Sequence, residues 1–144
     1  MQIKKVLIAD DDADDREIFE RVLGKKTNVR LMHSAENGKE VIDYLGRINS
    51  PEDLPNLIIL DHNMPKMNGL EFLKVIRADD RLRNIKVFVM TTSGEEGDRR
   101  TTEQLGISGY LIKPLNFNNN SKRSDSMDGF VQFHLRKILA SKQA

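Results

Sequence analysis

Residues 57–69 read LIILDHNMPKMNG, an apolar run that ends abruptly at Asp61. Four consecutive apolar residues between turn signals are typical of a strand buried on both faces of a parallel sheet. Such a strand brings the residue that follows it to the carboxyl edge of the sheet, where open α/β folds bind their ligands. We therefore expect Asp61 to present its carboxylate at a rigid, exposed edge.

The composition limits the class of protein. A chain of 144 residues accommodates one domain with a substantial core, and we interpret 1–144 as a single domain. The 23 basic and 22 acidic residues nearly cancel, which argues against a nucleic-acid-binding module. The absence of cysteine excludes disulfides and thiolate sites. No apolar run is long enough for a membrane span or a signal peptide, so we expect a cytoplasmic protein without membrane contact.

Strands and helices alternate along the whole chain. Apolar residues at helical spacing predict helices after the first, second, third and fifth strands, of which the second covers 36–48 and the last covers 127–140. The helix after the fourth strand, 94–104, is polar almost throughout, and residues 115–126 form an Asn- and Ser-rich insert that we interpret as a surface loop. This order predicts an α/β fold, a three-layer, doubly wound, five-stranded parallel sheet. The predicted strands are 6–9, 28–33, 57–60, 85–90 and 110–112.

Acidic residues also follow the first strand. Asp14 and Asp15 fit the first turn of a helix, where carboxylates complement the helix dipole. Asp10 and Asp11 lie at the strand end itself, and adjacent carboxylates repel each other unless a cation or a proton neutralises them. For this pair, helix N-terminal chemistry and a metal-binding role are both open.

Polar residues follow four of the five predicted strands, and in a doubly wound sheet these strand ends point the same way. Carboxylates with an Asn carbonyl make a hard-oxygen cluster that suits Mg²⁺ better than zinc or copper. An added hydroxyl and a cation suit an anion with several oxygens, such as a phosphoryl group. The residues concerned are Asp10, Asp11, Asp61, Asn63, Thr91 and Lys113.

Four motifs together resemble the receiver domains of two-component response regulators. They read VLIADDD, ILDHNMPKMNG, VFVMTTS and GYLIKPL, and they occur in the order found in that family. The resemblance covers nearly the whole chain. The chain is most similar in type to stand-alone, single-domain members such as the chemotaxis regulator. It implies a flavodoxin-like sheet with strand order 2-1-3-4-5.

The resemblance also implies roles for single residues. Asp61 is the expected phosphoacceptor, which takes its phosphoryl group from a sensor histidine kinase or a histidine phosphotransfer protein. Lys113 is expected to pair with the phosphoryl group, and Pro114 to follow a cis peptide bond. Thr91 and Tyr110 form the expected switch that alters binding to a downstream protein not identified by the sequence. Mg²⁺ is expected on Asp11, Asp61 and the Asn63 backbone carbonyl, with Asp10 acting mostly through water.

Three positions depart from the usual family pattern. His62 follows the expected phosphoacceptor, where an apolar or aromatic residue is more usual. It either alters access to the acyl phosphate or its lifetime, or is a harmless exposed side chain, and we favour the second interpretation. Asn63 lies at a variable position that affects hydrolysis of the acyl phosphate. The insert 115–126 leaves the dimer common in this family open.

Two other functions are compatible with parts of this pattern. A magnesium-dependent phosphohydrolase with an aspartate nucleophile also uses Asp, Mg²⁺ and Lys, but it usually has a second acid where this chain has Asn63. A binding module that has lost phosphorylation would be expected to lack at least one of the site residues, and this chain retains them all.

Overall fold

The structure is a computed structural model, and it describes residues 3–24, 29–62, 64, 66–91 and 104–112. The predictions at 115–126 and 127–140, and nearly all of the one at 94–104, lie outside these residues. Within them, no helix is both long and apolar enough to cross a bilayer. The elements in chain order are β1 (Lys4–Ala9), α1 (Ala13–Gly24), β2 (Val29–Ala35), α2 (Gly38–Gly46), a 3₁₀ turn (Pro51–Asp53), β3 (Leu57–Asp61), α3 (Gly69–Ala78), β4 (Lys86–Thr91) and β5 (Gly109–Ile112).

The five strands form one parallel sheet in the order β2-β1-β3-β4-β5. This confirms both the predicted doubly wound sheet and the strand order that the family resemblance implied. β3 lies in the middle, paired with β1 on one side and β4 on the other, and all five of its residues are buried. The predicted strand 28–33 is too short, because Ser34 and Ala35 continue the pairing with β1.

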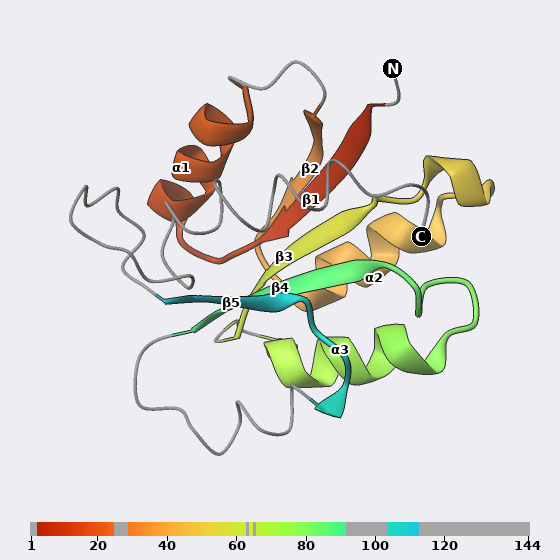
Figure 1. Cartoon of the computed structure of the whole chain (residues 1–144). Helices are drawn as coiled ribbons and strands as arrows, with labels where there is room; N and C mark the ends of the chain where they lie inside the picture. The colour runs from red at the N-terminus through yellow and green to blue at the C-terminus, as the bar shows by residue number, and fades with distance from the viewer. Residues whose placement is uncertain (1–2, 25–28, 63, 65, 92–103, 113–144) are drawn as a thin grey trace.

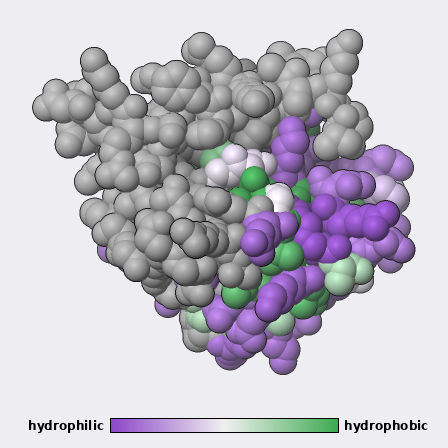
Figure 2. Space-filling view, turned by 60° about the horizontal axis from the view of Figure 1, so that its bottom comes forward, coloured by the Kyte–Doolittle hydropathy of each residue, from purple (hydrophilic) through white to green (hydrophobic). Residues whose placement is uncertain are grey.

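Helices cover both faces of the sheet, with α1 on one side and α2 and α3 on the other (Figure 1). β3 contributes alternate residues to two buried clusters: Leu57 and Ile59 pack with α1, whereas Ile58 and Leu60 pack with α2 and α3. Full burial of each such side chain contributes about 1.5–3 kcal/mol. On the face seen in Figure 2, the described surface is mostly hydrophilic, with hydrophobic residues in small patches. The sheet is therefore fixed from both sides at the strand that carries Asp61.

Side-chain caps set the limits of the helices. Asn37 accepts a hydrogen bond from the Glu40 backbone N–H at 2.8 Å, so α2 begins at Gly38 rather than at residue 36 as predicted. At the other end of α2, Arg81 donates to the Leu45 carbonyl at 2.7 Å. A capping box of Asn68 and Glu71 starts α3. The start of α3 is therefore fixed eight residues after the predicted phosphoacceptor.

Candidate functional site

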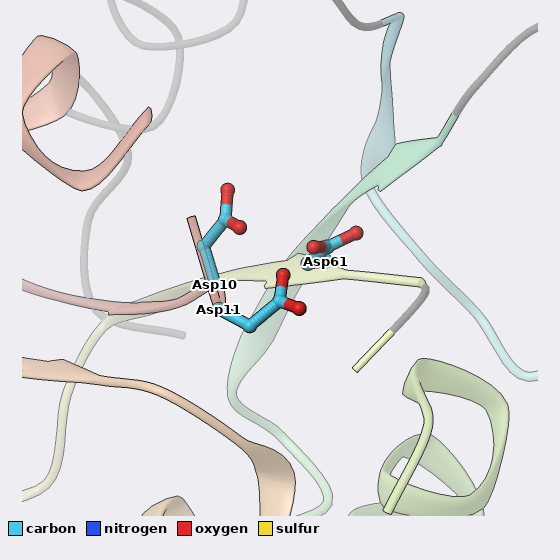
Figure 3. Close-up of side chains that lie close together, drawn as sticks. All are labelled: Asp10, Asp11 and Asp61. Atoms are coloured by element: carbon cyan, nitrogen blue, oxygen red, sulfur yellow. The ribbon is translucent and has the colours of Figure 1, made fainter. Parts of the chain in front are cut away.

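Three carboxylates meet at the carboxyl edge of the sheet. Asp61 is the last residue of β3, and Asp10 and Asp11 follow β1, its neighbour in the sheet. Ala9 pairs with Leu60, so the next residues of the two strands lie side by side. One carboxylate oxygen from each of the three aspartates lies within 4.8 Å of the others (Figure 3). The convergence predicted from the sequence is thus present for these three residues.

The cluster is more buried than predicted. Asp61 is 3 % exposed and Asp10 is fully buried, whereas Asp11 is exposed. The expectation that Asp61 lies at an exposed edge is therefore wrong, because β3 is the central strand and its last residue is still enclosed by the layers. Burial places like charges in a medium that screens them poorly, so a cation or a proton at the cluster would relieve the repulsion between its carboxylates.

The loop from β1 to α1 is held by backbone and side-chain hydrogen bonds. The Asp10 N–H donates to the Ala35 carbonyl at 3.0 Å, which joins the loop to the end of β2. The Asp12 N–H donates to the Asp10 carboxylate at 2.9 Å. Arg16, on α1, donates to the Asp10 carbonyl at 2.6 Å. Asp14 and Asp15 lie in the first turn of α1, as predicted from the helix dipole.

The loop from β3 to α3 is packed tightly against the site. The His62 N–H donates to the Met90 carbonyl and the Gly69 N–H donates to the His62 carbonyl, both at 2.9 Å. His62 is 6 % exposed, so its interpretation as an exposed side chain is wrong. The reason is tertiary: these two hydrogen bonds place His62 between β4 and the start of α3. Lys66 has φ 68°, a left-handed conformation that non-glycine residues rarely adopt.

The other predicted site residues are placed only in part. Thr91 ends β4 and is 7 % exposed, one position beyond the Met90 that pairs with Asp61. The backbone of Tyr110 belongs to β5 and pairs with Val89. Asn63, Lys113 and the predicted cis bond before Pro114 lie outside the described residues. The described edge thus brings Thr91 and three aspartates to the ends of three adjacent strands.

The three aspartates suit a divalent metal ion. Hard oxygen ligands bind Mg²⁺ at about 2.0–2.1 Å, so two oxygens on one ion lie up to about 4.2 Å apart. The 4.8 Å limit of the cluster is close to this separation, and a small side-chain rotation or one bridging water brings all three into reach. The group contains neither His nor Cys, which disfavours zinc and copper. The acidic cluster is therefore capable of holding a divalent cation.

Comparison with known proteins agrees with this geometry. Residues 6–123 match the family described as the response regulator receiver domain. This chain belongs to that family. A chemotaxis protein CheY homolog of Campylobacter jejuni subsp. jejuni is 35 % identical over 115 residues, which are 77 % of this chain and 82 % of that protein. As a receiver domain of two-component signalling, the chain is not a conventional enzyme, so the phosphohydrolase interpretation is not supported.

Two solved receiver structures resemble the fold over much of its length. The Mn²⁺-bound form of response regulator Rcp1 is 30 % identical with a TM-score of 0.78, covering 98 % of this chain and 99 % of that one. The phosphorylated cyanobacterial phytochrome response regulator RcpA is also 30 % identical with a TM-score of 0.67, covering 79 % of this receiver and 83 % of that chain. The fold of this receiver is thus shared with regulators described as metal-bound and phosphorylated.

Sequence reasoning missed two structurally important contacts. The contact of Arg16 with the Asp10 carbonyl joins residues six apart across a loop. Its sequence signal was weak: an arginine one helical turn after Asp12, in a helix that carries other charges. The close approach of Gly69 to the backbone of Asp61 and His62 had no local signal beyond the glycine itself.

Proposed function

We propose that this receiver is a phospho-accepting signalling switch in which Asp61 takes a phosphoryl group from the phosphohistidine of a sensor histidine kinase or a histidine phosphotransfer protein. The observation that carries the proposal is the placement of Asp61, at the end of a central buried strand and within 4.8 Å of Asp10 and Asp11. A nucleophilic carboxylate is useful for phosphoryl transfer only where its position is fixed and its charge is offset.

The transfer is a single displacement at phosphorus. A carboxylate oxygen of Asp61 forms a bond to phosphorus as the P–N bond to the donor imidazole breaks, and the imidazole leaves with the electron pair. Little acid–base chemistry is needed, so positioning and charge neutralisation provide most of the catalysis. Mg²⁺, when bound, neutralises charge on the phosphoryl oxygens. Asp11, Asp61 and the Asn63 carbonyl would hold it directly, with Asp10 acting through water.

Two further residues complete the proposed phosphoryl site. Thr91, at the end of the strand beside Asp61, would donate its hydroxyl to a phosphoryl oxygen. Lys113 directly follows β5 in the sequence and would pair with the same group. Each donor lies in sequence at the end of a different strand, so both depend on the sheet for their approach to Asp61.

Signalling requires that phosphorylation favour one of two conformations. We propose that a bond from Thr91 to the phosphoryl group draws that residue toward Asp61, with Tyr110 moving inward on the neighbouring strand. The face formed by β4, β5, residues 94–104 and the last predicted helix would then change its affinity for a downstream protein. A ligand shifts such an equilibrium only by its different affinity for the two states.

The central experiment is intact-mass analysis after treatment with acetyl phosphate and Mg²⁺. We expect one phosphoryl adduct on the wild type and none on Asp61→Asn. Asp80→Asn is the matched control, since Asp80 is an exposed acid two residues beyond the end of α3 with its side chain 91 % accessible. An equal adduct on the wild type and Asp61→Asn, or none on the wild type, would refute the assignment of Asp61.

The switch has its own test. Two-dimensional NMR of the protein, with and without acetyl phosphate and Mg²⁺, would follow the amides of Thr91, Gly109 and Tyr110. We expect these signals to shift while those of α2 stay in place. Unchanged signals on the β4–β5 face of a protein shown by mass to be phosphorylated would eliminate the switch and leave the phosphoacceptor intact.

A further inference from the structure

Arg16 reaches back from α1 to the loop that carries Asp10 and Asp11. Its Nη1 donates to the Asp10 carbonyl at 2.6 Å, and its Nη2 lies 3.9 Å from a carboxylate oxygen of Glu36. The Arg16 side chain is only 18 % exposed, whereas that of Glu36 is 70 % exposed. The short bond to the carbonyl is therefore the better-shielded contact, and the distant pair with Glu36 contributes little.

The carbonyl that Arg16 holds belongs to the peptide unit joining Asp10 to Asp11. Because a peptide unit is planar, fixing its oxygen also fixes the direction in which the chain enters Asp11. The other side of Asp10 is held by its N–H bond to Ala35 at 3.0 Å. Asp11 is the exposed member of the acidic cluster, so its side chain depends more on this backbone than on packing for its direction.

We propose that Arg16 is a positioning residue for the divalent-metal site: it orients the Asp10–Asp11 peptide so that the Asp11 carboxylate points at the ion. This inference rests on the proposed function of the aspartate cluster. It assigns to Arg16 no contact with the metal or with the phosphoryl group. Groups that orient metal ligands in this way typically change metal affinity at least tenfold when they are removed.

The charge of Arg16 makes the proposal testable. A guanidinium close to the cluster repels a divalent cation, so its removal should strengthen metal binding if electrostatics alone were at work. Loss of orientation has the opposite effect and weakens binding. A role limited to general stability would change the unfolding temperature and leave the affinity of the folded protein unaltered.

The experiment measures metal affinity in the folded, full-length protein. Mn²⁺ binding is followed by the electron paramagnetic resonance signal of the free ion, and Mg²⁺ binding by competition with Mn²⁺. The variants are Arg16→Gln, which removes the charge, and Arg16→Lys, which keeps the charge but not the planar fork. The controls are Arg21→Gln, on the same helix with a 71 % exposed side chain, and Glu36→Gln.

We expect both Arg16 variants to bind Mn²⁺ and Mg²⁺ about tenfold more weakly, and both controls to bind as the wild type does. Thermal unfolding establishes which variants are folded, and Arg16→Lys alone decides the outcome if Arg16→Gln does not fold. Wild-type or tighter affinity in a folded Arg16 variant would overturn the proposal. If the wild type is phosphorylated on Asp61 by acetyl phosphate, the proposed function stands even when the proposal for Arg16 fails. A wild type that binds no divalent ion would overturn both the proposal for Arg16 and the proposed function.

Discussion

At the scale of single residues, Gly69 is the position where a side chain is least tolerable next to the site. A Cβ added to it would lie 2.9 Å from the Cα of His62 and 3.0 Å from the carbonyl oxygen of Asp61, both backbone atoms that cannot rotate away. We expect Gly69→Ala to lower the free energy of unfolding by about 1–3 kcal/mol through overpacking. Urea unfolding followed by circular dichroism measures the change.

The matched control for this substitution is Gly46→Ala. Gly46 ends α2, and a Cβ there would meet nothing within 4 Å. Alanine is the better helix former, so this variant should be as stable as the wild type or more stable by up to about 1 kcal/mol. Equal losses in the two variants would show that the contact of Gly69 with the Asp61 backbone is not the cause.

Lys66 provides a second prediction at this scale. Its φ of 68° places an L-residue in the left-handed region, at a cost of about 1–2 kcal/mol that glycine does not incur. Lys66→Gly should therefore unfold at a higher urea concentration than the wild type. Lys74→Gly, at an exposed position inside α3, should do the reverse by about 1 kcal/mol. A loss of stability in Lys66→Gly would contradict the assignment of strain to this loop.

At the scale of elements, Arg77 joins the end of α3 to two separate segments. Its guanidinium donates to the carbonyls of Arg83 and Ile85 before β4, and to those of Leu105 and Gly106 before β5, at 2.7–3.0 Å. Burial lowers the pKa of Arg77, because desolvation disfavours the charged form, but the group stays protonated at neutral pH. One side chain thus connects three elements at the edge opposite the aspartates.

We expect Arg77→Gln to lower the free energy of unfolding by about 2 kcal/mol, since it leaves several carbonyls without their charged donor. Hydrogen exchange should increase at Ser108, whose N–H donates to the Val87 carbonyl at 2.8 Å as β5 begins. Arg83→Gln is the control, because its 3.3 Å pair with Asp80 is exposed and worth less than about 1 kcal/mol. Unaltered hydrogen exchange at Ser108 would show that Arg77 does not stabilise the start of β5.

At the scale of the whole molecule, the acidic cluster couples stability to metal binding. Three carboxylates within 4.8 Å of one another repel in the metal-free protein, and a cation that binds only the folded state stabilises it. At a Mg²⁺ concentration one hundred times the Kd, this gain is about 2.7 kcal/mol. Differential scanning calorimetry across a Mg²⁺ series should therefore show an unfolding temperature that rises with concentration.

Asp11→Asn separates the repulsion between the carboxylates from the stabilisation by bound Mg²⁺. Without Mg²⁺, this variant should be at least as stable as the wild type because one repelling charge is gone. With Mg²⁺, it should lose most of the metal-dependent rise in unfolding temperature. Asp80→Asn removes another exposed charge, far from the cluster, and should keep the full rise. A rise of the same size in Asp11→Asn would exclude Asp11 from the metal site.

The sequence by itself determined the architecture and much of the site. Runs such as 57–60 are apolar at every position because a central strand is buried on both faces, so the local pattern already carries the tertiary environment. Strand ends in a parallel sheet share one edge, which is why the meeting of Asp10, Asp11 and Asp61 could be predicted without coordinates.

Only the tertiary structure decided how these residues are enclosed and supported. Three features depend on segments that come together from different parts of the chain. They are the burial of Asp61 and His62, the hydrogen bond from Arg16 to the Asp10 carbonyl, and the contact of Gly69 with the end of β3. Local periodicity reports which face of an element is apolar. It does not report the distance to a neighbouring backbone, because that distance is set by how the layers pack.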